Sequence, residues 1–242
     1  PASRIMGRVM DMDPEAEIGA DWLEAKLDRA LAHRARLYDA PFYRLVHAEG
    51  DHLPGLIIDR FGDTLVMQPN AAWLENHLDI LVAALLKVTG VQNIVKNASS
   101  RARALDGLDD ETMVLAGEPS ERVLVPMNGA QYVADLAEGQ KTGLFFDQRP
   151  NQAFAARFAK DASVLDVFSH VGGFALAALA HGARDALAVD GSAPALELAQ
   201  DGAEAMGMGD KLTTLKSDAF AALETLAEQG RRFELVICDP PA

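Results

Sequence analysis

The sequence predicts an α/β protein whose C-terminal part is a parallel sheet with helices on both faces, preceded by a smaller α+β unit. From about residue 150, helical and strand patterns alternate strictly as far as residue 238. Each strand and its helix take roughly 20 to 25 residues, a spacing that favours parallel strands joined by right-handed crossovers. The earlier part of the chain has hairpin signals instead, so we expect it to fold as a separate unit.

The region before residue 150 mixes helical periodicity with alternating strand patterns. Its expected elements are a helix over 14–38, a strand over 43–47, a hairpin of 56–60 with 64–68, a helix over 73–88, a strand over 93–96, a loop over 98–111 and a second hairpin of 123–126 with 131–135 around Asn128-Gly129. We therefore expect residues 1–40 to be the end of a preceding domain with a linker helix. Residues 41–140 are then a central α+β unit of two hairpins and one helix, and residues 141–242 carry the parallel sheet.

The alternating region is expected to contain four strands and four helices. They are helix 150–160, strand 163–168, helix 172–181, strand 186–190, helix 193–206, strand 212–216, helix 219–229 and strand 233–238. The last strand reads as buried, and its Cys238 is expected to be inert. A doubly wound sheet needs more strands than these, and the chain starts at Pro1 on a strand-like pattern, so we expect it to be an internal piece of a longer protein.

Composition and charge exclude several classes of protein. Hydrophobic residues make up 49% and charged residues 24%, and no apolar run approaches the roughly 18 to 20 residues that cross a bilayer, so we expect no membrane segment. One cysteine excludes an internal disulfide framework and suits a reducing, cytoplasmic compartment. The six histidines are scattered, so no metal site is predicted. A net charge of −14 argues against a protein that binds nucleic acid by charge alone.

Ligands of parallel α/β sheets bind at the carboxyl ends of the strands, and these ends carry polar and acidic residues here. The strand at 163–168 runs into Phe168-Ser169 and then Gly172-Gly173 at a helix start. Two glycines let the backbone approach a ligand closely, although helix packing alone explains them equally well. We expect all four residues to contact a bound cofactor.

The next two strands end in aspartates. Asp190 follows a buried strand and suits the two hydroxyls of a ribose, with Ser192 beside it, whereas the alternative is a plain helix start. Asp218 suits an adenine amino group, with Phe220 near the ring, and a helix cap is its alternative.

Asp239-Pro240-Pro241 is the most specific signal of the series. Two prolines directly after a strand fix a stiff extended turn, which leaves the carboxylate and carbonyl of Asp239 facing a pocket. We expect Asp239 and Pro240 to be catalytic, and Asp239 also to bind the cofactor. A further polar group, Asp147, Gln148 and Arg149, precedes a helix that Pro150 starts well, and we expect all three to line the same pocket.

These motifs together resemble the bacterial 23S ribosomal RNA methyltransferases that form 5-methylcytosine. The residues that carry the resemblance are Lys141-Thr142-Gly143, Asp147-Gln148-Arg149, Phe168-Ser169, Gly172-Gly173-Phe174, Asp190, Asp218, Asp239-Pro240-Pro241 and, earlier in the chain, the stretch from Leu53 to Gly62. It implies a class I, Rossmann-like methyltransferase domain that binds S-adenosyl-L-methionine. It further implies a PUA domain whose last strand is residues 1–9, and ribosomal RNA as the partner.

The chain departs from the general methyltransferase pattern at two points. Phe168 and His170 stand where a glycine loop has its first two glycines, so only Gly172 remains, as is usual in this family. The family's nucleophilic cysteine would add to C6 of cytosine, and the resemblance places it on a strand beyond residue 242. We expect the chain by itself to hold cofactor without turnover.

Three other functions fit part of this pattern. An N-methyltransferase also uses Asp-Pro-Pro, although an aromatic residue usually follows and Ala242 stands there. A nicotinamide-dependent dehydrogenase would use Asp190, although the loop lacks G-x-G-x-x-G. The third is a non-catalytic RNA-binding protein. The sequence leaves the oligomeric state open, with a homodimer as one candidate. Any RNA contact is expected in the central unit, through basic residues such as Arg44, Arg60, Lys96, Arg101 and Arg103, or on the PUA domain.

Overall fold

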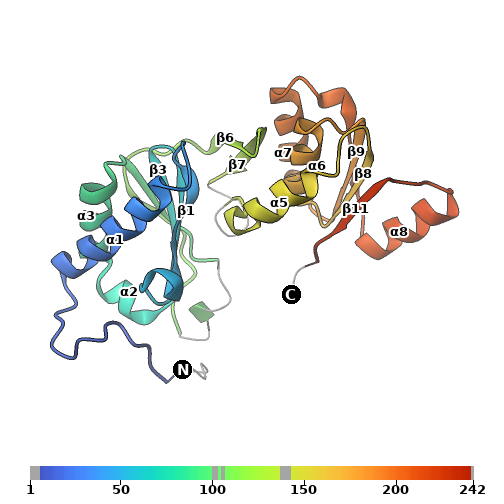
Figure 1. The fold of residues 1–242 in the computed structure, drawn as a ribbon. Helices are drawn as coiled ribbons and strands as arrows, with labels where there is room; N and C mark the ends of the chain where they lie inside the picture. The colour runs from blue at the N-terminus through green and yellow to red at the C-terminus, as the bar shows by residue number, and fades with distance from the viewer. Residues whose placement is uncertain (1–5, 100–102, 105–106, 137–142, 241–242) are drawn as a thin grey trace. The chain divides into compact units, whose positions relative to one another are not determined.

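The computed structural model describes residues 6–99, 103–104, 107–136 and 143–240. They form two compact units, which we describe separately (Figure 1). The first unit comprises Pro1–Glu121 and Leu136–Phe146, and the second comprises Arg122–Asp135 and Asp147–Ala242. No helix among the described residues is long and apolar enough to span a membrane.

The first unit is built on a five-stranded sheet. Its strands are β1 (Phe42–His47), β2 (Leu56–Phe61), β3 (Thr64–Pro69), β4 (Asn93–Lys96) and β5 (Met113–Ala116), in the spatial order β1-β2-β3-β4-β5. All neighbours are antiparallel except β3 and β4, because the chain crosses over between those two strands through helices. β5 was not expected from the sequence, since its four residues are only partly buried and show no alternation.

Three helices accompany this sheet: α1 (Ala20–Ala35), α2 (Ala72–Asn76) and α3 (Leu78–Thr89). α1 and α3 lie side by side on one face, and Leu23, Leu27, Leu81 and Leu85 bury themselves in the core (Figure 1). The helix expected over 73–88 is broken at His77, whose ring nitrogen donates to the carbonyl of Trp73 at 2.7 Å. That carbonyl would accept the His77 amide in a continuous helix, so the side chain replaces the backbone there.

Basic side chains of the first unit are largely committed to internal pairs. Arg44 binds the buried carboxylate of Asp59 through Nε and Nη2, at 2.9 and 3.1 Å. Lys96 and Arg103, both almost fully buried, pair with Glu75 and Asp109. Arg60 donates to the carbonyls of Gly62 and Thr89. These contacts stabilise the fold of the first unit. Whether Arg44, Arg60, Lys96 or Arg103 also contacts RNA stays a prediction, and Arg101 lies outside the described residues.

The hairpin of β6 (Arg122–Met127) and β7 (Ala130–Asp135) belongs to the second unit, although the sequence interpretation had grouped it with the central one. Asn128 and Gly129 both have positive φ, as a two-residue hairpin turn requires. β7 packs on helix α7 (Ala193–Ala205) so closely that a Cβ on Gly202 would lie 2.8 Å from the carbonyl of Gln131. Periodicity along the chain could not reveal this contact, because the two segments are about 70 residues apart.

A four-stranded parallel sheet forms the rest of the second unit. Its strands are β8 (Ser163–Val167), β9 (Asp185–Asp190), β10 (Leu212–Lys216) and β11 (Leu235–Cys238), in the order β10-β9-β8-β11. Helices α5 (Arg149–Ala156), α6 (Gly173–Ala180) and α7 lie on one side and α8 (Ala219–Glu228) on the other (Figure 1). The strand order reverses between β8 and β11, so the carboxyl end of β8 lies at a topological switch point.

Alternation along β8 and β9 divides their side chains between the two faces. Leu165, Val167, Leu187 and Val189 point toward α8 and pack against Ala222 and its neighbours. Asp166 points the other way, toward α6. The sheet therefore places one buried carboxylate directly beneath the loop that leads into α6.

Candidate functional site

The loop from β8 to α6 has an unusual backbone. Phe168, His170 and Gly172 have φ angles of 64°, 51° and 76°, so three alternating residues are left-handed although only one is glycine. A left-handed conformation costs an ordinary residue roughly 1 to 2 kcal/mol. Such strain gathers at ligand-binding segments, where the surrounding structure enforces it. The loop thus has the turns of an alternating glycine loop without the glycines at its first two places.

Each glycine of the Gly172-Gly173 pair has a packing reason of its own. A Cβ on Gly172 would lie 3.0 Å from the Cβ of Ala199 in α7, and one on Gly173 would lie 2.7 Å from the Nε2 atom of Gln152 in α5. Packing of α5, α6 and α7 therefore accounts for both residues. That their backbone approaches a ligand stays a prediction.

Asp190 at the end of β9 holds this loop in place. One carboxylate oxygen accepts the amide of His170 at 2.8 Å, and the other accepts the amide of Ser192 at 2.8 Å. A carboxylate offers about four acceptor sites, so both oxygens can still receive ribose hydroxyls. The helix-start alternative and the ligand prediction are therefore compatible at this residue.

Ser192 and Asp218 both cap helices. The Ser192 hydroxyl accepts the amide of Ala195 at 3.3 Å at the start of α7. Oδ1 of Asp218 accepts the amides of Phe220 and Ala221 at 3.0 and 3.1 Å at the start of α8, which leaves Oδ2 exposed to solvent. The Phe220 side chain is 72% exposed. The structure thus gives capping roles to both residues, and their contacts with a cofactor stay predictions.

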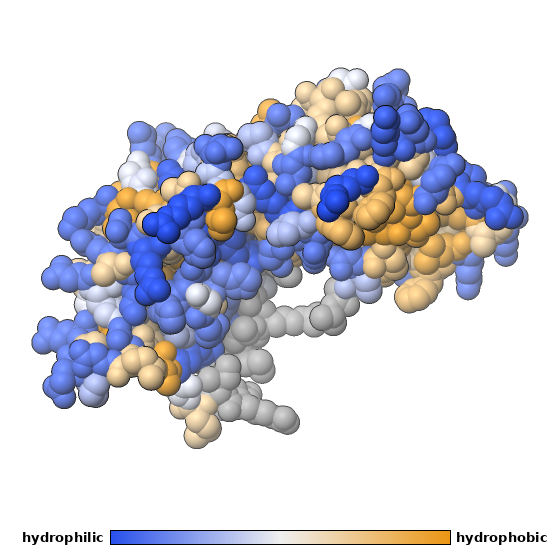
Figure 2. Space-filling model, in the orientation of Figure 1, coloured by the Kyte–Doolittle hydropathy of each residue, from blue (hydrophilic) through white to orange (hydrophobic). Residues whose placement is uncertain are grey.

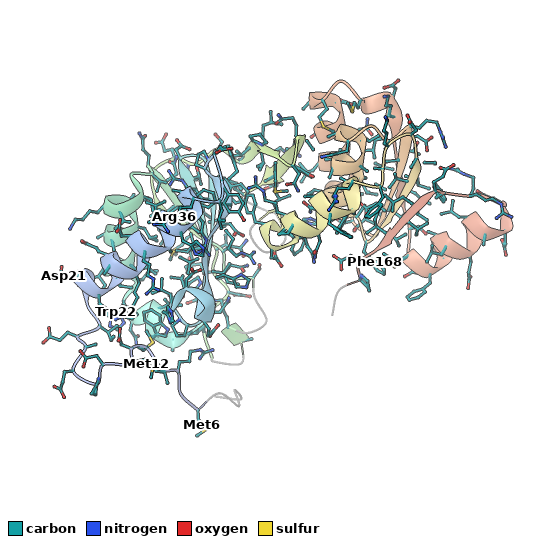
Figure 3. The ribbon with its side chains drawn as sticks, viewed as in Figure 1. Met6, Met12, Asp21, Trp22, Arg36 and Phe168 are labelled. Carbon is teal, nitrogen blue, oxygen red and sulfur yellow. The ribbon has the colours of Figure 1, made fainter. Side chains whose placement is uncertain are left out.

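Asp239 follows β11, next to β8. Its amide lies 3.4 Å from the carbonyl of Val167, which brings the end of β11 beside the loop at Phe168 (Figure 3). Asp239 and Pro240 are both exposed. Cys238 is exposed as well, so the expectation that it is buried was wrong. The error arose because β11 lies at the edge of the described sheet, where alternate side chains face solvent.

The sequence interpretation missed Asp166 as a site residue. It is fully buried in β8, and its Oδ2 accepts the amide of Ala175 at 2.9 Å. Burial raises the pKa of this carboxyl to about 7, backbone N–H groups of α6 oppose the shift, and the charges of Asp190 and Asp239 add to it. A signal was present in the sequence, since an acidic residue inside an otherwise apolar strand is rarely a packing residue.

Tyr132 connects the hairpin to the same loop. It is fully buried, and its hydroxyl donates to the carbonyl of Gly173 at 3.0 Å. Burial, and then the charge of Asp166, raise the pKa of Tyr132, and the charge of Arg149 lowers it. The position of Arg149 in the cofactor pocket stays a prediction. Asp147 is exposed beside it, and Gln148 accepts a hydrogen bond from Asn151 at 2.7 Å, so their roles at the site stay predictions.

Three buried polar atoms of the described residues at this site have no hydrogen-bond partner: Oδ1 of Asp166, Oγ of Ser169 and Oε1 of Gln152. Buried acceptors of this kind are costly unless a ligand or water satisfies them. Three carboxylates near one loop also suit a cationic ligand. The residues present therefore fit S-adenosylmethionine, which has a positive sulfonium, an amino group and a ribose diol. No group of three or more side chains among the described residues could hold a metal ion.

Comparison with known families identifies this arrangement. The family model of the S-adenosylmethionine-dependent methyltransferases matches residues 80–242, more than half of the chain. The chain belongs to this family. Its cofactor is S-adenosylmethionine, and membership decides against the nicotinamide-dependent dehydrogenase.

Curated relatives extend over the whole chain. Proteins named ribosomal RNA large subunit methyltransferase I, from Alteromonas mediterranea and Aliivibrio fischeri, are each 38% identical to it over 245 and 246 residues. The alignments cover 100% of this chain and 62% of each relative, so the chain spans less than two thirds of their length.

Solved structures show the same fold. A Streptococcus mutans protein assigned to the SAM-dependent methyltransferases matches with a TM-score of 0.83 and 23% identity, over 94% of this chain and 60% of its own. A methyltransferase solved with S-adenosylhomocysteine matches with a TM-score of 0.82 and 22% identity, over 94% of this chain and 59% of its own. The class I methyltransferase fold expected from the sequence is confirmed.

Proposed function

We propose that the protein methylates RNA of the large ribosomal subunit, and that the product is 5-methylcytosine. The observation that carries the first part is the 38% identity to proteins named ribosomal RNA large subunit methyltransferase I, which extends over the whole chain. The base and the atom modified rest on the motif resemblance, with Asp239-Pro240 as its most specific element.

Each strand end contacts a different part of the cofactor. When bound, S-adenosylmethionine supplies an electrophilic methyl group on a positively charged sulfur. Asp190 accepts the ribose hydroxyls while it keeps the amides of His170 and Ser192 in place. The free Oδ2 of Asp218 accepts from the adenine amino group, and Phe220 covers the ring. Asp166 and Ser169 turn their unpartnered oxygens to the positively charged end.

At the reacting base, Asp239 and Pro240 position the target. The Asp239 carboxylate and carbonyl accept from the exocyclic amino group of cytosine, and Pro240 restricts the backbone that presents them. A thiolate has to add to C6 before C5 becomes nucleophilic, and the motif resemblance assigns this role to a cysteine on a later strand. Asp147, Gln148 and Arg149 complete the proposed cofactor contacts. The strand expected over residues 1–9 is not present at residues 6–9, and residues 1–5 lie outside the described part of the chain.

The decisive experiment is methyl transfer by the whole protein to unmodified ribosomal RNA, with the product nucleoside identified by mass spectrometry. A 5-methylcytosine product supports the proposal. An N-methylated base would replace it with the N-methyltransferase alternative, and transfer to protein instead of RNA would overturn it.

Cofactor residues are tested separately by calorimetry. Asp190→Ala removes a charged acceptor and is expected to weaken binding of S-adenosylhomocysteine by about 1 to 3 kcal/mol. Asp201→Ala, a change of the same charge on the outer part of α7, serves as the matched control. Equal affinities for the two variants would exclude Asp190 from the cofactor site.

A further inference from the structure

A concave surface on the first unit carries a row of cations. Its walls enclose about 480 Å³ and are made by one stripe of α1 and by the turn after β1. The lining residues are Lys26, Arg29, Ala30, Ala32, His33, Arg36, Gly50, Asp51 and His52, and we call this surface the α1 groove. Figure 2 shows strongly hydrophilic atoms over α1, and Figure 3 labels Arg36 at the end of this helix.

Helix geometry places three cations, Lys26, Arg29 and Arg36, in a single row with His33 among them. Lys26, Arg29, His33 and Arg36 are three, four and three residues apart, which places them on one face of α1. At 1.5 Å per residue, the row is roughly 15 Å long. Ala30, Ala32 and Gly50 have little or no side chain, so the floor of the groove is open.

The charge of the groove is largely uncompensated. Within the described part of the chain, Arg29 and Arg36 are exposed and take part in no ion pair, whereas Lys26 lies 3.0 Å from Asp11. The one carboxylate of the lining, Asp51, is bound by both terminal nitrogens of Arg34 at 2.6 Å and does not oppose an anion. A local positive surface thus exists on a chain with a net charge of −14.

His52 reaches the groove from a strained turn. The short helix η1 (Ala48–Asp51) starts with a left-handed residue, Ala48, and is followed by another, His52, with φ of 43° and 59°. This turn places the imidazole of His52 in the lining of the groove, where it adds one more ring nitrogen. The lining contains no Phe, Tyr or Trp, so it lacks the large aromatic rings on which successive bases stack.

We propose that the α1 groove binds the phosphate backbone of the RNA substrate, independently of base sequence. This inference rests on the proposed function for the identity of the partner. A row of cations without large aromatic rings suits phosphates, which position an RNA without reading its sequence. The cations it uses are those the fold leaves available, and not the ones committed to Asp59, Glu75 and Asp109.

The test is fluorescence anisotropy with the full chain and two labelled RNA oligonucleotides of unrelated sequence, at about 50 mM salt and above. Arg29→Gln with Arg36→Gln should weaken binding of both RNAs about ten-fold, and should lower the steepness of the salt dependence by about 1.5. The matched control is Arg231→Gln with Arg232→Gln, an equal charge change on exposed residues before β11, at the far end of the sheet from the site.

A second variant adds charge to the groove instead of removing it. No atom lies within 4 Å of a Cβ built on Gly50, so Gly50→Glu fits without a clash and should weaken binding, whereas Gly50→Gln should not. The proposal is overturned if the wild-type chain binds neither RNA at low salt, or if the groove variants bind as well as the control. Failure of the proposed function would look different: methyl transfer would be absent while the groove variants still lowered RNA binding.

Discussion

Among the described residues, each of the two units buries one aspartate completely, and the two aspartates have opposite electrostatic surroundings. In the first unit, Asp59 receives two hydrogen bonds from Arg44, whose side chain is 13% exposed. In the second unit, Asp166 receives only backbone amides, and the nearest charges that act on its pKa are the carboxylates Asp190 and Asp239. A carboxylate paired with a cation stabilises a fold once it is formed, whereas one surrounded by like charge remains available to a cationic ligand.

A change of pH tests the contrast between Asp59 and Asp166 most directly. Because the pKa of Asp166 is raised to about 7, its protonated form is favoured in the folded second unit. Its contribution to the free energy of unfolding is complete below about pH 4 and falls by roughly 4 kcal/mol as the pH rises to 7. Asp166→Asn should remove this fall, and should make the second unit more stable than wild type above pH 7.

Hydrogen exchange of amides in β8 and β9, corrected for intrinsic rates, measures this effect at several pH values. Asp210→Asn, at an exposed aspartate of the same unit, should keep the wild-type pH dependence. Parallel curves for wild type and Asp166→Asn would show that Asp166 is ionised in the folded protein throughout this range.

Removing the partnered aspartate should have the opposite sign. Asp59→Ala leaves Arg44 without its counter-charge and is expected to lower the free energy of unfolding of the first unit by about 3 kcal/mol. Both tryptophans of the chain, Trp22 and Trp73, lie in this unit and touch each other, so their fluorescence in urea reports on it alone. Asp28→Ala, at an exposed position of α1, is the control. A midpoint that moves equally in both variants would refute the structural role of the buried pair.

A smaller effect separates backbone strain from packing at the loop. Gly172→Ala should cost about 2 kcal/mol, because φ is 76° and the new Cβ meets Ala199 at 3.0 Å. Gly207→Ala has a similar φ of 68° with no atom within 4 Å, so it should cost only about 1 kcal/mol. Thermal unfolding followed by circular dichroism compares the two variants. Equal losses would mean that the contact with α7 adds nothing.

The smallest effect is expected at an exposed ion pair of the second unit. Arg122 lies 3.3 Å from Asp201, and their side chains are 56% and 44% exposed. Arg122→Gln should change the free energy of unfolding by less than about 0.5 kcal/mol, since solvent screens such pairs. A loss above about 1 kcal/mol in urea unfolding would show that the hairpin depends on this pair, and would weaken the contrast between buried and exposed charge.

Local patterns were enough to predict the parallel sheet. Strict alternation from residue 150 located all four strands within about two residues, because each strand and helix there carries its own periodicity. The break at His77 could not be predicted this way, since a single side-chain hydrogen bond causes it. The same is true of the hairpin's place on α7, which depends on a contact between distant segments.

The site shows the same division. The strand-end aspartates followed from sheet topology, and the structure brings the charges of Asp190 and Asp239 within reach of one buried carboxyl. The sequence could not predict which basic residues are exposed and unpaired, because nothing in the local pattern separates Arg44 and Arg103 from Arg29 and Arg36. Only the distances to Asp59, Glu75 and Asp109 distinguish the two groups.

The left-handed turns at Phe168 and His170 also bear on how binding is divided between enthalpy and entropy. Glycine at these places would adopt the same turns without strain, but would leave the loop with more conformations to lose when a ligand binds. A partly buried phenylalanine ring, packed against the apolar cluster beneath, keeps the backbone in one shape beforehand. Because folding already holds the loop in one conformation, the loop loses less conformational entropy when a ligand binds.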